Sequence, residues 1–206
     1  MKYKYLIYDF DGTISDTYPC VADALLDVLA EYGFHDTYEG AYAKLKVSFG
    51  YALQRYDFPD DPKTMSEKLH FYHGLRAPEQ QKPFPESAEI LRYARERGCL
   101  NFIYTHSAEL PSRLMEKWGI LGEFTEVINS TYGFPRKPAP DALKFIMQKH
   151  QLDPAECLMI GDRDIDIEAG HNAGIAGCLL DPEHFYDTAA VEYRIGNLLE
   201  LKEIIG

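Results

Sequence analysis

The stretch KYLIYDFDGT, residues 4–13, decides the fold that this sequence predicts. Residues 5–8 are β-prone and mostly apolar, which is typical of a buried strand. The strand ends in Asp9 and Asp11, and Gly12 permits a sharp turn after them. Ligands bind at the carboxyl edge of open α/β sheets, so these two carboxylates lie where a site is expected. The pair indicates a divalent-metal site, an acid/base pair or a polar turn that merely closes the strand.

Length and composition narrow the class of protein. The chain has 206 residues and a net charge of −12 at pH 7. This length suits one α/β domain with a smaller insertion, and the charge argues against nucleic-acid binding, which needs a basic face. No apolar run approaches the ~20 residues of a membrane helix, and no secretory signal is recognisable. The four cysteines form no CxxC motif and are expected to be buried free thiols, so a cytoplasmic protein without a membrane partner is predicted.

From residue 83 onward, predicted strands alternate with predicted helices. Apolar runs indicate strands at 5–8, 99–104, 126–128, 157–160 and 176–180, and helical spacing indicates helices at 86–97, 111–118, 142–150, 165–173 and 198–205. This alternation favours an α/β fold with a Rossmann-like parallel sheet and helices on both faces. A helical block interrupts it, so we expect a core domain of residues 1–15 and 82–206 and an inserted helical domain of residues 16–81. Within the insertion, helices are expected at 38–53 and 64–75.

Polar groups follow the predicted strands and should converge at one edge of the sheet. Asp9 and Asp11 follow the first strand, Thr105 follows the second and Asp162 follows the fourth, while Lys137 precedes a helix nearby. Aspartate oxygens are ligands that Mg²⁺ prefers, and a hydroxyl, a backbone N–H and a lysine can hold phosphate. This combination fits phosphoryl transfer, in which catalysis is mostly positioning and charge stabilisation.

Four ordered motifs resemble those of the haloacid dehalogenase-like superfamily of phosphatases. They are DFDGTISDT at 9–17, Thr105 after an apolar strand, Lys137 in the segment KPAPD, and Gly161-Asp162 followed by Asp166. The resemblance covers nearly the whole chain. The insertion is similar to the helical cap of the subgroup that includes phosphoglycolate phosphatase and β-phosphoglucomutase, and such a cap closes over the site and reads the leaving group.

The resemblance implies a role for each motif residue. Asp9 is the expected nucleophile that forms an aspartyl-phosphate, and Asp11 is the expected general acid and base. Thr105 and Lys137 are expected to bind the phosphoryl group. The expected Mg²⁺ ligands come from four residues: Asp9, Asp11 through its backbone carbonyl, Asp162 and Asp166. Asp164 departs from the motif spacing and is expected to be a helix N-cap.

Other residues are candidates with open alternatives. His106 and Ser107 follow Thr105 and are candidates for phosphate or substrate binding, and the alternative for His106 is a hydrogen-bonded histidine at the rim of the pocket. Lys44 and Lys46 lie where relatives in this superfamily place a substrate-reading loop, and the alternative is that they are exposed charges on a helix.

These expectations define a function with alternatives. The favoured function is a Mg²⁺-dependent phosphatase of a small phosphomonoester, of the phosphoglycolate or sugar-phosphate type. Asp11 can protonate a leaving alkoxide, which favours phosphatase or phosphomutase chemistry. A phosphomutase of the β-phosphoglucomutase type shares the same core motifs, and a non-catalytic ligand-binding or regulatory protein with this fold is the third alternative. The expected partner is a small phosphate ester, and the protein is expected to be a monomer or homodimer.

Overall fold

The computed structural model describes residues 2–186 and 190–206 and divides the chain into two compact units. The first unit comprises Met1–Ser15 and Pro83–Gly206, and the second comprises Asp16–Lys82. We call them the sheet unit and the helical unit. The two linking segments, β2 (Ser15–Asp16) and β3 (Lys82–Pro83), form a two-stranded sheet.

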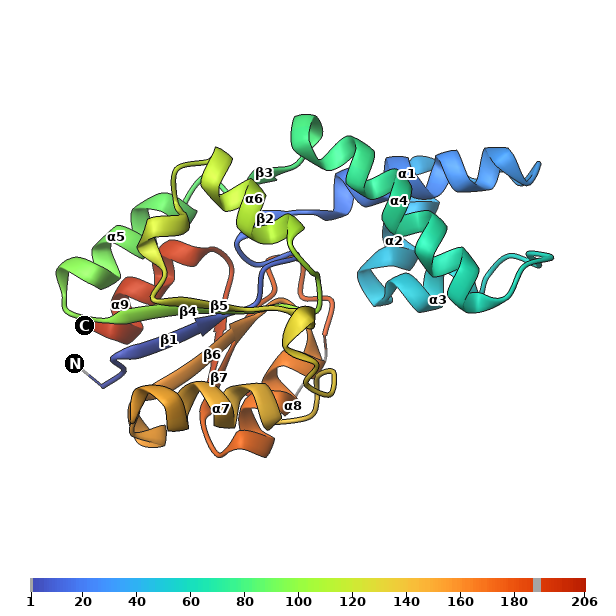
Figure 1. The fold of residues 1–206 in the computed structure, drawn as a ribbon. Coiled ribbons are helices and arrows are strands. Elements are labelled where there is room, and N and C mark those ends of the chain that lie inside the picture. Colours follow the sequence, from blue (N-terminus) through green and yellow to red (C-terminus); the bar gives the residue numbers. More distant parts are fainter. Residues whose placement is uncertain (1, 187–189) are drawn as a thin grey trace. The chain divides into compact units, whose positions relative to one another are not determined.

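A six-stranded parallel sheet forms the centre of the sheet unit (Figure 1). Its strand order is β5-β4-β1-β6-β7-β8. The strands are β1 (Tyr5–Tyr8), β4 (Leu100–Tyr104), β5 (Glu126–Ile128), β6 (Cys157–Gly161), β7 (Ala176–Leu180) and β8 (Tyr193–Ile195). The central strands are apolar apart from the buried Asn101 in β4, because helices cover both faces of the sheet. The predicted Rossmann-like fold class is confirmed, and β8 is an additional strand that the sequence pattern did not predict.

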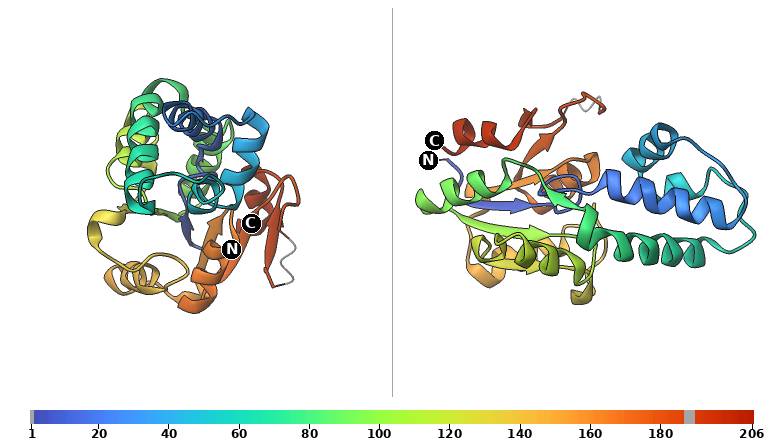
Figure 2. Two further views of the ribbon diagram at one scale, coloured as in Figure 1. Left: turned by 90° about the vertical axis from the view of Figure 1, so that its right-hand side faces the viewer. Right: turned by 90° about the horizontal axis from the view of Figure 1, so that it is seen from above.

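Helices cover both faces of this sheet. Figures 1 and 2 show α7 and α8 on one face and α5, α6 and α9 on the other. Their bounds are α5 (Ser87–Glu96), α6 (Leu110–Lys117), α7 (Asp141–His150), α8 (Asp164–Ala173) and α9 (Leu201–Ile205). In α5 the predicted apolar face is buried, because Ile90, Leu91 and Ala94 recur at helical spacing.

The helical unit consists of α1 (Tyr18–Glu31), α2 (Tyr38–Val47), α3 (Phe49–Leu53) and α4 (Pro62–Gln80). The single helix expected at 38–53 is wrong. Ser48 is extended and ends α2, and its hydroxyl accepts the N–H of Tyr51 to begin α3. Helix α4 is longer than the expected 64–75, because the Asp61 carboxylate caps its first turn.

A buried polar chain joins the two ends of the helical unit. The buried side chains of His73 on α4 and Gln81 after it share a hydrogen bond of 2.7 Å between Nε2 and Oε1. The Gln81 amide donates in turn to the hydroxyl of buried Thr17, just before α1, at 2.9 Å. These hydrogen bonds satisfy polar groups that would otherwise be costly to bury.

Among the described residues, no helix combines the length and apolarity needed to cross a bilayer. All four cysteines are buried and free, as expected.

Candidate active site

Three neighbouring strands deliver polar side chains to one edge of the sheet. Strand β1 lies between β4 and β6, so Asp9, Thr105 and Asp162 follow adjacent strands. The backbone N–H of Asp9 donates to the Ile160 carbonyl at 2.8 Å, which continues the ladder one residue past β1. All three side chains are buried. The sheet thus brings these residues together, as the motif order predicts.

The chain turns back directly after Asp9. The Phe10 carbonyl accepts the N–H groups of Ile14 and Ser15, and Gly12 has φ 82°. A left-handed backbone at this point favours glycine, which has no Cβ to clash. The turn places the Asp11 carboxylate where the hydroxyl of Ser107 donates to it at 2.9 Å.

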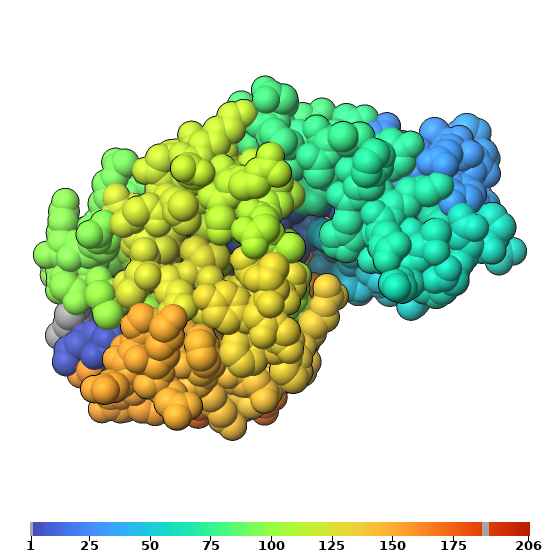
Figure 3. All heavy atoms as spheres, viewed as in Figure 1, coloured from blue at the N-terminus to red at the C-terminus, as the bar shows by residue number. Residues whose placement is uncertain are grey.

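Lys137 contributes a buried ammonium to this edge. It lies in a segment without regular structure between β5 and α7, which occupies part of the surface of the sheet unit (Figure 3, yellow). Its Nζ is 2.6 Å from Asp9 Oδ1 and 2.7 Å from Asp166 Oδ1. Burial acts to lower the pKa of Lys137, but the Asp166 and Asp9 carboxylates outweigh it and raise this pKa. The ammonium therefore stays charged.

Asp9, Asp162 and Asp166 form a buried group of carboxylates. One oxygen from each lies within 4.8 Å of the others. Burial raises the pKa of Asp9 well above its ordinary value, the Lys137 charge lowers it, and the two other carboxylates raise it further. Three buried carboxylates lie around the Lys137 ammonium, and an excess of negative charge is costly in a buried place. Hard oxygen ligands with this excess charge fit Mg²⁺. Asp11 lies outside this carboxylate group.

Asp166 is held by the residues that begin α8. Its Oδ2 accepts the N–H of Arg163 at 3.2 Å. A Cβ at Gly161 would approach the Asp166 side chain to 2.3–2.5 Å, so only glycine lets Asp166 come this close to β6. The expectation that Asp164 is the N-cap is wrong, because Arg163 occupies that position and Asp164 is the first helical residue.

The segment after Thr105 contacts two other parts of the site. The Thr105 hydroxyl accepts the N–H of Ser107 at 3.1 Å. His106 Nε2 accepts the backbone N–H of Lys137 at 2.8 Å. Burial and the nearby charges of Lys137, Arg136 and Arg163 lower the pKa of His106 to about 3. The imidazole is therefore neutral at ordinary pH, as its acceptor role requires.

Tyr104 is a site residue that the sequence analysis missed. Its ring lies 4.7 Å from Lys137 Nζ, within range of a cation–π interaction. Tyr104 is the last residue of β4 and directly precedes Thr105, and this position could have identified it as a site residue from the sequence. Which cation lies beside the Tyr104 ring depends on the path by which residues 133–140 return to the sheet. The spacing of motifs along the sequence does not reveal this path.

The candidate lysines of the helical unit have partners within that unit. Lys44 Nζ forms an ion pair with Asp36 at 2.7 Å and donates to the Gly40 carbonyl at 3.2 Å. Lys46 Nζ lies 4.6 Å from the centre of the Tyr18 ring. Substrate binding by these lysines stays a prediction.

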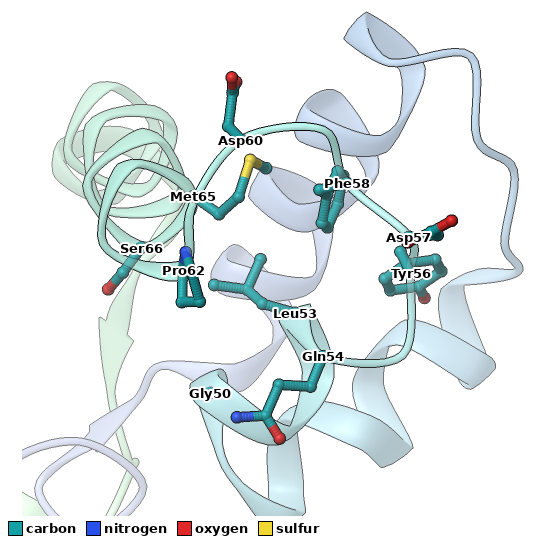
Figure 4. Close-up of a pocket in the computed structure, with 10 residues that line it drawn as sticks. All are labelled: Gly50, Leu53, Gln54, Tyr56, Asp57, Phe58, Asp60, Pro62, Met65 and Ser66. Atoms are coloured by element: carbon teal, nitrogen blue, oxygen red, sulfur yellow. The ribbon is translucent and has the colours of Figure 1, made fainter.

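A cavity of about 270 Å³ lies within the helical unit, between α3, the following loop and the start of α4. Figure 4 shows Leu53, Phe58 and Met65 among its lining side chains. The predicted site residues are not among those that line it, so this cavity is distinct from the aspartate cluster.

Comparisons with known proteins agree with the motifs. The family model described as haloacid dehalogenase-like hydrolase matches residues 6–179. A phosphoglycolate phosphatase of Vibrio vulnificus (strain YJ016) is 28% identical over 188 residues, covering 84% of this chain and 81% of that protein. A second, of Haemophilus influenzae (strain ATCC 51907 / DSM 11121 / KW20 / Rd), is 25% identical over 191 residues, covering 85% and 84%.

Solved structures share the fold over the whole chain. A hydrolase from Streptococcus pneumoniae TIGR4 has a TM-score of 0.69 at 29% identity, covering 100% of this chain and 99% of that one. A putative phosphatase from Clostridium difficile has a TM-score of 0.85 at 18% identity and covers 100% of both chains. The resemblance that the four motifs predicted is thus confirmed.

Proposed function

Because the chain belongs to the haloacid dehalogenase-like hydrolases, we propose that it is a Mg²⁺-dependent phosphatase of a small phosphomonoester. The observation that carries this proposal is the contact of Lys137 Nζ with Asp9 Oδ1, in a buried site beside Asp11. An ammonium at this position lowers the pKa of Asp9 and so offsets part of the effect of burial, which raises it. Asp9 is then a nucleophile held beside the positive charge that an incoming phosphate needs.

In the first step, an Asp9 oxygen attacks phosphorus and forms an O–P bond. The ester O–P bond breaks, and Asp11 in its acid form gives its proton to the leaving alkoxide. The Ser107 hydroxyl, which donates to Asp11 Oδ2, orients the carboxyl group for this transfer. The products are a free alcohol and an aspartyl-phosphate at Asp9.

In the second step, Asp11 accepts a proton from water as the water oxygen attacks phosphorus. The bond between Asp9 and phosphorus breaks, which releases inorganic phosphate and restores both carboxyl groups. Thr105 and Lys137 hold the phosphoryl oxygens in both steps.

Asp9, Asp162 and Asp166, with the Asp11 backbone carbonyl, are the proposed holders of Mg²⁺. Bound Mg²⁺ would offset the negative charges of the phosphoryl oxygens and of the carboxylates around them. The buried carboxylate group supports this proposal, because its excess negative charge favours a divalent cation.

The proposed substrate is phosphoglycolate or a sugar phosphate, and the names of the relatives from Vibrio vulnificus and Haemophilus influenzae support phosphoglycolate. We further propose that residues 16–81 act as a cap domain that reads the leaving group, beside a core domain of residues 1–15 and 82–206. Lys44 and Lys46 are the proposed contacts for a substrate carboxylate or second phosphate. A reducing, cytoplasmic setting is in keeping with four buried free thiols.

The test is phosphate release from phosphoglycolate, sugar phosphates and nucleotides, with Mg²⁺ or EDTA. The isosteric variant Asp9→Asn should lose more than about 10³-fold in kcat, because an amide is no nucleophile. Activity of Asp9→Asn near the wild-type level would refute the role of Asp9. A sugar phosphate that isomerises without phosphate release would indicate a phosphomutase. Ligand binding without turnover on the whole panel would indicate a non-catalytic protein.

A further inference from the structure

Lys137 carries the only ammonium that contacts the Asp9–Asp166 pair among the ion pairs of residues 2–186 and 190–206. It nevertheless lies on a segment with no helix or strand, residues 133–140. Such a segment has few backbone hydrogen bonds of its own to fix its position. A displacement of about 1 Å at a reacting group can cost up to about 10²-fold in rate. Something outside the segment must therefore hold it.

Three side chains of the sheet unit hold this segment on both sides of Lys137. The Tyr104 hydroxyl donates to the Pro135 carbonyl at 3.3 Å. The Asn172 amide donates to the Pro138 carbonyl at 3.0 Å. Between these two, His106 Nε2 accepts the N–H of Lys137 itself at 2.8 Å. The His106 contact is the shortest of the three, and it alone acts on the residue that carries the ammonium.

We propose that His106 is a positioning residue, whose neutral imidazole fixes the Lys137 backbone and thereby the Lys137 ammonium beside Asp9. The proposal rests on the proposed function for the importance of Lys137 in catalysis. It differs from a role in binding substrate, because it uses the Nε2 lone pair, which the Lys137 N–H engages, whereas binding a phosphate oxygen would use the Nδ1–H donor. A neutral imidazole has only one nitrogen that can accept a hydrogen bond.

The surroundings of His106 favour the neutral form. A charged imidazolium would lose its acceptor and would face three cationic side chains, those of Lys137, Arg136 and Arg163. The Tyr104 ring packs edge-on against His106 with 5.8 Å between ring centres, and it also lies 4.7 Å from Lys137 Nζ. One tyrosine thus contacts both the histidine and the ammonium, so the backbone and the side-chain end of Lys137 are held from the same strand.

The test compares three variants of His106 that differ in where they place a hydrogen-bond acceptor for the Lys137 backbone N–H. His106→Gln places an amide oxygen at about the position of Nε2, whereas His106→Asn reaches only the position of Nδ1 and His106→Met offers no strong acceptor. We expect His106→Met and His106→Asn to lose about 10–100-fold in kcat/KM on phosphoglycolate and on p-nitrophenyl phosphate alike. His106→Gln should stay within about threefold of the wild type. A loss limited to the KM of one substrate would overturn the proposal, since it would indicate a substrate contact.

A double-variant comparison asks whether His106 acts through Lys137. In a Lys137→Met background, His106→Met should lower the residual kcat/KM by less than about twofold, because coupled residues are not additive. An equal loss in both backgrounds would overturn the proposal.

A readout that needs no activity separates this proposal from the proposed function. In ¹⁵N-histidine NMR spectra of the wild-type protein at neutral pH, His106 should carry its proton on Nδ1. The Lys137 amide resonance should shift in His106→Met and much less in His106→Gln. A proton on Nε2 would overturn the proposal even in an active enzyme. If His106 carries its proton on Nδ1 but the protein is inactive on every phosphate ester, the contact between His106 and Lys137 is supported. Only the proposed function is then refuted.

Discussion

The two units of this protein each bury a polar cluster, and the two clusters differ in charge. In the helical unit, the chain of His73, Gln81 and Thr17 is held by two side-chain hydrogen bonds and includes no carboxylate. In the sheet unit, Lys137 faces the Asp9 and Asp166 carboxylates, with Asp162 beside them. A hydrogen-bonded cluster without carboxylates can connect a helix end to a neighbouring segment without burying a negative charge. An unbalanced buried charge destabilises a fold, so its presence points to function.

The two clusters also differ in whether they need a bound cation to balance their charge. In the cluster of the helical unit, His73, Gln81 and Thr17 supply hydrogen-bond partners to one another. The cluster of the sheet unit retains more negative than positive charge, so a bound cation should change its stability. The following predictions test this contrast, from the largest expected effect to the smallest.

Removal of the one ammonium should have the largest effect on folding. Lys137→Met removes the ammonium that pairs with the buried Asp9 and Asp166 carboxylates, so in EDTA the free energy of unfolding should fall by about 3–5 kcal/mol. Urea denaturation measures this change. The matched control is Lys202→Met, since Lys202 pairs with Glu89 at the surface, and such a pair is worth about 0–1 kcal/mol. Equal losses in the two variants would show that the buried ion pairs of Lys137 contribute no more to stability than a surface ion pair.

Mg²⁺ should stabilise the wild-type protein. At about 100 times its dissociation constant, a ligand that binds only the folded state adds about 2.7 kcal/mol to the free energy of unfolding. Thermal unfolding with Mg²⁺ and with EDTA should therefore differ by several degrees. Asp162→Asn should abolish most of the difference, because it removes a proposed ligand. A wild-type curve that Mg²⁺ leaves unchanged would contradict the proposed metal site.

Acid should weaken the sheet unit through His106. Burial and nearby positive charges lower the pKa of His106 from 6.5 to about 3, so the folded state resists protonation. Below pH 6.5 the unfolded chain binds a proton that the folded chain does not. The stability from neutral His106 is therefore complete above pH 6.5 and is lost as pH falls toward 3. The loss attributable to this group should reach about 2 kcal/mol at pH 5.

The measurement is the free energy of unfolding of wild type and His106→Gln at several pH values. Because glutamine does not titrate, the difference between the two proteins should change by that amount between pH 8 and pH 5. Parallel pH curves would show that His106 titrates with an ordinary pKa.

Disruption of the cluster in the helical unit should cost less than removal of Lys137. His73→Leu removes the buried hydrogen bond between His73 Nε2 and Gln81 Oε1, which should lower the free energy of unfolding by about 1–2 kcal/mol. Mg²⁺ should stabilise this variant as much as the wild type, since the cluster is formed within the helical unit. A His73→Leu variant insensitive to Mg²⁺ would show that the two clusters are not independent.

Most of the sheet unit could be predicted from local patterns. Apolar runs followed by polar residues identified five of its strands, because strands buried on both faces have few polar positions. The additional strand β8 has Arg194 at its centre and therefore no apolar run, whereas the equally short β5 has the adjacent apolar residues Val127 and Ile128. In the helical unit, the break at Ser48 was missed because a serine within helical spacing can either cap a helix or continue it.

The sequence by itself determined which strand ends carry chemistry. Asp9, Thr105 and Asp162 each follow an apolar strand, and parallel strands place their carboxyl ends at one edge. Only the tertiary structure decided what these groups contact. That His106 accepts from Lys137, that Ser107 donates to Asp11 and that Tyr104 lies beside the ammonium all depend on where loops return. Loop paths are set by contacts between residues far apart in the chain, and no periodic pattern in the sequence encodes them.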